Sequence, residues 1–153
     1  YLNEFESSLV ICFSGQSRES AKIIEKQVTG LKALDEQTMA AMHEIKQHAA
    51  EMKSLLLAGQ VRKTADVLQQ SWLAKKSTAT TITNSIIDDL IGVAMANGAW
   101  GGKVSGAGGG GFIMLLADPS RRHNLIEALN ENGGAASAVR LTFEGPESWV
   151  VPG

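Results

Sequence analysis

The sequence predicts an α+β domain in which several helices cover a small antiparallel sheet. Short β-like runs stand near the start of the chain, around a glycine-rich loop at 105–111, and near the end. Between the first run and the loop, apolar residues recur with helical spacing. The chain has 153 residues, of which 44% are hydrophobic and 20% charged, as in one globular domain with its own core. We therefore expect residues 1–153 to form a single domain.

The first third of the chain predicts one strand followed by two helices. Residues 8–13 are β-like, and Ser14-Gly15 ends them before a helix expected at 17–28, with Ser17 as its N-cap. Apolar residues at spacings of three and four then predict a long helix that Gly59 ends. These residues form a stripe: Met39, Met42, Ile45, Ala49, Met52 and Leu55.

The methionine-rich stripe has two interpretations. A packed core face is preferred, because methionine commonly fills irregular gaps between helices. The alternative is a partner-binding face, for example the interface of a homodimer.

The middle of the chain predicts two further helices. Val61, Ala65, Leu68 and Trp72 share one face of the first. The second covers 82–96 and is apolar around more of its circumference, so we expect it to be the most buried helix.

The last third predicts the glycine-loop hairpin, a helix and a final strand. Asp118-Pro119 places a capping carboxylate and a proline at the start of this helix, and Gly133-Gly134 ends it. Residues 139–143 predict the last strand, with a short one at 149–151.

Composition excludes two classes of partner. A net charge of -2 and a pI near 5.9, without any basic run, argue against nucleic-acid binding. The longest apolar run, 112–117, is far below the roughly 18 residues of a membrane span, and the first residues do not show a cationic region followed by an apolar one. We expect a cytoplasmic protein that binds no membrane. The lone Cys12 lies in an apolar run and predicts a small buried residue.

The glycine loop predicts a ligand-binding backbone. Five of the six positions from 106 to 111 are glycine, which leaves amides bare for a ligand's oxygens. Gly106, Gly108 and Gly111 satisfy G-x-G-x-x-G, but a strand follows where a dinucleotide-binding loop needs a helix. The nucleoside-triphosphate loop G-x-x-x-x-G-K-[ST] also fails, because Phe112 and Ile113 follow Gly111.

Residues 103–111 instead resemble the third motif of the GHMP small-molecule kinases, K-x-[ST]-G-A-G-x-G-G followed by an apolar strand, and every position matches. Upstream, Ile87-Asp88-Asp89-Leu90 resembles the family's I/L-D-x-L helix. Residues 3–9 and 14–21 resemble the branch that includes heptose 7-phosphate kinases. The chain departs from that branch at Ser85, where relatives tend to have proline.

The resemblance implies the ferredoxin-like C-terminal domain of these kinases. It also implies transfer of the ATP γ-phosphoryl group, with Mg²⁺, to a hydroxyl of a sugar or sugar phosphate, heptose 7-phosphate first. The family's earlier ATP-binding motif is not found in these residues. We therefore expect a C-terminal half whose N-terminal kinase domain is separate and which is inactive alone. The alternative is a non-catalytic metabolite-binding or regulatory module derived from the same fold.

The loop is the main candidate site, with its amides and the Ser105 hydroxyl directed to phosphate oxygens. Its residues are Ser105, Gly106, Ala107, Gly108, Gly109, Gly110 and Gly111. Because the family's base and Mg²⁺ ligands are expected in the other half, no catalytic residue is assigned here.

Three charged residues are further candidates for substrate binding. Arg18 and Lys103 could meet a phosphate or simply point to water, and Asp88 is more readily a structural cap or ion pair. No metal site is expected, since His43 and His48, five residues apart on one helix, face different sides.

Overall fold

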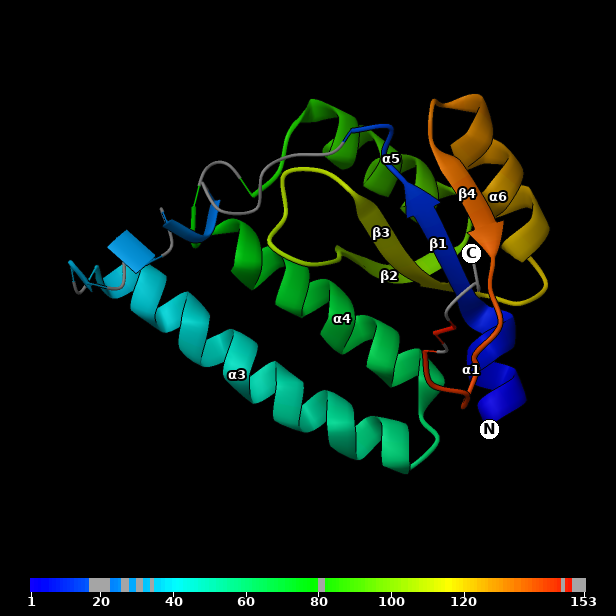
Figure 1. Cartoon of the computed structure of the whole chain (residues 1–153), viewed down its shortest axis with the longest axis horizontal. Coiled ribbons are helices and arrows are strands. Elements are labelled where there is room, and N and C mark those ends of the chain that lie inside the picture. Colours follow the sequence, from blue (N-terminus) through cyan, green and yellow to red (C-terminus); the bar gives the residue numbers. More distant parts are fainter. Residues whose placement is uncertain are drawn as a thin grey trace.

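The computed structural model describes residues 1–16, 23–25, 28–29, 32–33, 35–79, 82–146 and 148–149. Within them the chain follows the predicted order of strand, helices, glycine-loop hairpin, helix and strand, so the α+β class is confirmed (Figure 1). The elements are α1 (Leu2–Ser8), β1 (Leu9–Phe13), α3 (Glu36–Leu57), α4 (Val61–Lys76), α5 (Ser85–Ala96), β2 (Ala99–Val104), β3 (Phe112–Ala117), α6 (Arg122–Glu131) and β4 (Ala135–Ala138).

The four described strands form one antiparallel sheet in the order β2-β3-β1-β4. Val10 at the centre lies opposite Leu115 on β3 and Ala138 on β4. The two central strands are the most apolar, and the short or glycine-containing strands β2 and β4 form the edges. This is the ferredoxin-like arrangement that the resemblance implied.

Alternate side chains of the strands point to opposite faces of the sheet. On one side, which we call the closed face, Val10 and Leu115 pack with Leu90 of α5 and with Leu125 and Leu129 of α6 in the larger apolar core.

On the other side, which we call the open face, Leu9 and Leu116 pack with Ala65 and Leu68 of α4. Helix α3 lies beyond α4, so α4 is between α3 and the sheet (Figure 1).

Helix α4 covers the edge strand β2 at very close range. A Cβ atom on Gly101 would lie 2.1 Å from the carbonyl oxygen of Ala65, so only glycine allows the two backbones to approach this closely. One turn along, the Gln69 side chain accepts a hydrogen bond of 3.1 Å from the Gly102 amide. The helix thereby pairs part of a sheet edge that would otherwise face water.

This position makes α4 the more buried of the two middle helices, so the expectation for the helix at 82–96 was wrong. Nine of the sixteen residues of α4 are buried, against four of twelve in α5, where Ile86 and Met95 remain exposed. Helix α4 has neighbours on two sides, whereas α5 presents one side to water.

The long helix α3 is confirmed, but its methionine stripe is not the packed core face that we expected. Thr38 and Ala41 are the buried residues of α3, whereas the stripe residues are half-buried and Ala49 is exposed. The reason is that α3 packs mainly against α4, so it covers the open face incompletely.

The helix expected to start at Asp118-Pro119 starts later. The Asp118 carboxylate accepts hydrogen bonds from the Ser120 amide and hydroxyl, 2.9 and 2.7 Å, and so forms a local turn. Helix α6 then begins at Arg122, and Gly133, with φ of +86°, follows its end as predicted.

The last strand was predicted at the wrong place. Strand β4 is Ala135–Ala138, whereas residues 139–143 adopt no regular structure. The Asn130 side chain accepts from the Ala136 amide at 2.6 Å and donates to its carbonyl at 3.4 Å, which holds this weak β-former beside β1. Trp149 is 79% exposed and is not in a strand, and residues 150–151 of the short strand lie outside the described residues.

One further difference concerns the first third of the chain, where helix α1 was not predicted. Most of the helix expected at 17–28 lies outside the described residues. Cys12 is buried as expected, and burial raises the pKa of its thiol.

Candidate functional site

The glycine loop joins β2 to β3 at one end of the sheet. Gly106, Gly108, Gly109 and Gly111 have positive φ angles of 71°, 106°, 75° and 84°, which residues with a Cβ rarely adopt. Ser105 and Gly106 are exposed, whereas residues 108–110 are buried. The first part of the loop therefore faces solvent and the second part is packed inside the domain.

Hydrogen bonds fix the second part of the loop to two other segments. The Gly109 amide donates to the Ile82 carbonyl and the Gly111 amide to the Gln16 carbonyl, both at 2.7 Å. The side-chain amide of Asn84 joins this network through both its nitrogen and its oxygen. Its Nδ2 donates to the Gly109 carbonyl at 3.1 Å, and its Oδ1 accepts from the Ile87 amide at 3.0 Å as the N-cap of α5.

This cap also explains the departure from the family pattern. With Asn84 as N-cap, Ser85 occupies the first position of α5, where proline is favoured because no amide is needed. A serine there keeps the same helix start, and α5 begins at Ser85 rather than at Ile82.

The solvent-facing part of the loop keeps amides for a ligand. Within the described part of the chain, the amides of Gly106, Ala107, Gly108 and Gly110 have no hydrogen-bond acceptor, whereas those of Gly109 and Gly111 bond to protein carbonyls. Of the four, Gly106 is exposed and Ala107 half-buried, so these two lie in the solvent-facing part. Bare amides on consecutive residues suit the oxygens of a phosphate group. Such a group, whether on ATP or on a sugar phosphate, therefore fits the donors that this loop offers.

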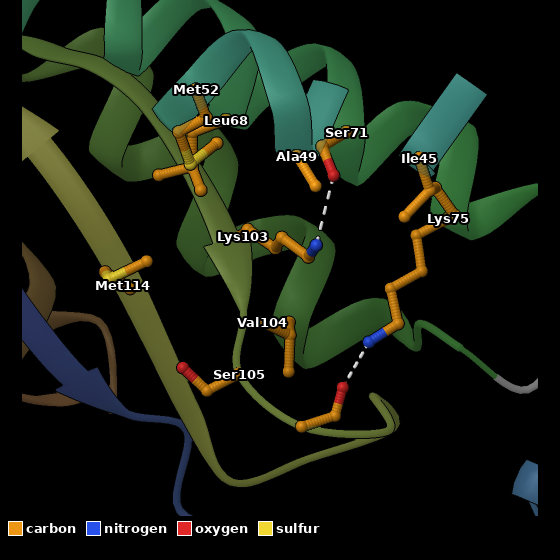
Figure 2. Close-up of a pocket in the computed structure, with 11 residues that line it drawn as sticks. Ile45, Ala49, Met52, Leu68, Ser71, Lys75, Lys103, Val104, Ser105 and Met114 are labelled. Carbon is orange, nitrogen blue, oxygen red and sulfur yellow. Dashed lines mark hydrogen bonds between the residues drawn. The ribbon is translucent and has the colours of Figure 1, made fainter. Parts of the chain in front are cut away.

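A pocket of about 330 Å³ lies between the beginning of the loop, β2, β3 and the helices α3 and α4 (Figure 2). Two lysines and two serines line one part of it, and aliphatic and methionine side chains line the rest. The lining residues are Ile45, Ala49, Met52, Leu68, Ser71, Lys75, Lys103, Val104, Ser105, Gly106 and Met114.

Lys75, which sequence reasoning missed, is the most unusual side chain in this pocket. It is only 8% exposed, and its Nζ donates a hydrogen bond to the Gly106 carbonyl, which ties the last turn of α4 to the loop (Figure 2). Burial, with a smaller effect from the charge of Lys103, lowers the pKa of Lys75 to about 8. The available signal was that Lys75 continues the apolar spacing of Leu68 and Trp72, where a charge is unexpected.

Lys103 was predicted as a candidate, and the structure places it in the same pocket. Its Nζ donates to the Ser71 hydroxyl at 3.0 Å, and burial lowers the pKa of its ammonium group. Neither Lys75 nor Lys103 forms an ion pair across the described residues. Two cations that share a pocket without a carboxylate make it electropositive.

The other charged candidates are elsewhere. The Asp88 carboxylate accepts from Lys76 at 3.4 Å and from the Thr83 hydroxyl at 3.0 Å, and it does not line the pocket. This arrangement agrees with the preferred structural role. Arg18 lies outside the described residues. Among those that are described, no three His, Cys, Asp or Glu side chains come together as metal ligands, and no helix has the length and apolar character to cross a bilayer.

Known proteins share both the sequence and the fold. The chain is 39% identical over 149 residues to D-glycero-alpha-D-manno-heptose 7-phosphate kinase of Campylobacter jejuni, covering 97% of this chain and 43% of that protein. The structure of a proposed sugar kinase from C. jejuni matches with a TM-score of 0.63 and 33% identity, covering 97% of this chain and 40% of the other.

The mevalonate kinase of L. major in complex with R-mevalonate shares the fold, with a TM-score of 0.74 at 17% identity, over 82% of this chain and 38% of its own. This chain thus spans less than half the length of each relative. The family model described as GHMP kinases C terminal matches residues 52–135, which include α4, α5 and the glycine loop. The chain therefore belongs to the GHMP kinase C-terminal family.

Proposed function

We propose that this chain forms the phosphate-loop half of an ATP-dependent sugar kinase, with heptose 7-phosphate as the first candidate substrate. The single observation that carries the proposal is the loop, whose buried second part is fixed by Ile82, Asn84 and Gln16 while Gly106 and Ala107 keep bare amides. The likeness to the C. jejuni heptose 7-phosphate kinase supports the choice of substrate. An N-terminal kinase half and a cytoplasmic location belong to the same proposal.

Phosphoryl transfer requires mainly alignment and positive or dipolar groups around the phosphates. Here the amides of Gly106 and Ala107 donate to phosphate oxygens, and the exposed Ser105 hydroxyl stands beside them. Lys75 holds the Gly106 carbonyl, so the loop needs little reorganisation when a phosphate binds. ATP supplies the phosphoryl group. The described residues offer no ligand set for Mg²⁺, so we assign the metal and the base to the other half.

The test uses the polypeptide that carries this chain, assayed with ATP against heptose 7-phosphate, galactose and mevalonate. Gly106→Ala is the informative variant, because Gly106 has φ of +71° and open space around its Cβ position. We expect at least a tenfold fall in kcat with heptose 7-phosphate, since a displaced amide donor typically costs that much or more.

Gly133→Ala is the matched control. Gly133 has φ of +86° and equally open space, but it follows α6 and lies outside the loop. We expect it to keep wild-type turnover with a similar loss of stability. Equal turnover in both variants would count against a catalytic loop. Binding of sugar phosphate without any transfer would favour the alternative, a non-catalytic metabolite-binding or regulatory module.

A further inference from the structure

We infer that the pocket between α3, α4 and the start of the glycine loop binds a small ligand that has an anionic head, a phosphate monoester or a carboxylate, and an apolar body. The head would lie between Lys75 and Lys103, and the body would lie along the methionine-lined part. This ligand is distinct from the polar sugar of the proposed reaction.

The head group follows from the two lysines. Each ammonium loses water on burial, and across the described residues neither gains a carboxylate in exchange. Their only described partners are neutral oxygens, the Gly106 carbonyl and the Ser71 hydroxyl (Figure 2). Buried charges are normally paired. An anion between the two would supply the missing partner and remove the repulsion between them.

The apolar body follows from the remaining walls. Ile45, Ala49 and Met52 of α3 face Leu68 of α4 and Met114 of β3, and their side chains offer no hydrogen bond to a sugar hydroxyl. In Figure 2 the side chains of Met52, Leu68 and Met114 lie away from Lys75, on the other side of Lys103. The volume of about 330 Å³ is at the lower end for ligand sites, which suits a short chain or ring.

The half-buried stripe of α3 is consistent with this role. Met52 contacts the smaller apolar cluster, yet it remains partly accessible on the pocket side. Flexible thioether side chains adapt to varied apolar shapes. An apolar body placed here would complete the packing that α3 leaves unfinished.

The pocket shares Ser105 and Gly106 with the loop, so its influence on catalysis rests on the proposed function. Binding itself does not. The test is therefore a calorimetric titration of this chain with n-butyl phosphate, inorganic phosphate and n-butanol.

We expect butyl phosphate to bind about tenfold more tightly than inorganic phosphate, because its methylenes enter the apolar part. Butanol should bind weakly or not at all. Lys75→Met and Lys103→Met should each weaken butyl phosphate binding about tenfold or more. Lys63→Met, which removes the same charge from an exposed position on α4, should leave it unchanged.

Ala49→Trp provides a second test that changes no charge. Ala49 is exposed on α3 and lines the pocket, so a tryptophan there should fill the apolar part without disturbing the core, and butyl phosphate binding should be lost. This variant keeps the test decisive even if a lysine variant folds poorly.

Several results would overturn the inference. They are the absence of butyl phosphate binding, equal affinity for butyl phosphate and inorganic phosphate, or unchanged binding in Lys75→Met. If a hexose phosphate bound more tightly than butyl phosphate, the inference that the ligand has an apolar body would be wrong. A polypeptide that phosphorylates heptose 7-phosphate normally while failing these titrations would keep the proposed function and lose only this site.

Discussion

The two faces of the sheet differ in how completely they are packed. On the closed face, Leu115, Leu125 and Leu129 are fully buried among apolar neighbours. On the open face, Met52 and Met114 are half-buried and two lysines without ion-pair partners in the described chain line a pocket. The closed face therefore contributes more to stability. The open face contributes less, because it contains a pocket and two lysines instead of a filled core.

Neighbouring residues of one strand belong to these different environments. Val104 is fully buried in the closed-face core, whereas Lys103 reaches Ser71 on the side of α4. Because side chains alternate along a strand, these consecutive residues point to opposite faces of the sheet, although Val104 also borders the pocket. The glycine loop begins at the next residue, so core, pocket and loop meet at the end of β2.

The largest expected effect is a truncation on the closed face. Leu125→Ala removes a fully buried side chain and should lower the free energy of unfolding by about 3 kcal/mol, through lost burial and a cavity. Met52→Ala on the open face should cost less than about 1 kcal/mol, because Met52 is already half-exposed. Urea denaturation measures both, and equal losses would show that the two faces contribute equally.

Next in size is the contact between α4 and the edge strand. Gly101→Ala places a Cβ 2.1 Å from the Ala65 carbonyl oxygen, so α4 must move away, at a cost of about 2 kcal/mol. The same variant should also weaken butyl phosphate binding, since the pocket lies between these elements. Gly92→Ala in α5 has open space and should instead stabilise by about 0.5 kcal/mol, which makes it the control in thermal unfolding.

A further expected effect, on the pH dependence of stability, concerns the charge of Lys75. Its pKa is about 8 in the folded chain, against 10.5 for an unperturbed lysine, so between these values the unfolded chain binds more protons. Stability from this group is therefore reduced below pH 8 and rises with pH above it. We expect the melting temperature of the wild type, relative to Lys75→Met, to increase from pH 7.5 to about 10.

The same titration bears on the pocket. Lys75 from α4 and Lys103 from β2 are the titratable groups that line it, while α3 and β3 contribute apolar residues. Butyl phosphate binding should weaken as the pH rises above 8, because the Lys75 ammonium loses its proton. A pH-independent affinity between pH 7 and 9.5 would contradict a role for Lys75 in holding the anion.

Local sequence signals predicted the elements that have strong periodicity or unusual backbone needs. The 105–111 loop was found because glycines cluster between two apolar runs, and α3 and α4 were found from their repeating apolar positions. The weak strand β4 was missed because Ala135–Ala138 has little intrinsic preference for a strand and depends on β1 and Asn130. Residues 139–143 have more suitable side chains but no partner strand among those described.

The sequence by itself determined the α+β class, the family, the glycine loop and the candidacy of Lys103, since each depends on residues that are close together in the chain. Only the tertiary structure decided that α4 packs against β2, that α3 leaves the open face half-covered, and that Lys75 meets Lys103 in one pocket. The physical reason is that burial and charge pairing depend on residues distant in sequence, here 28 positions apart for the two lysines. The sequence pattern of a helix does not show whether a lysine on it faces water or a pocket, because that depends on the elements that the fold packs against it.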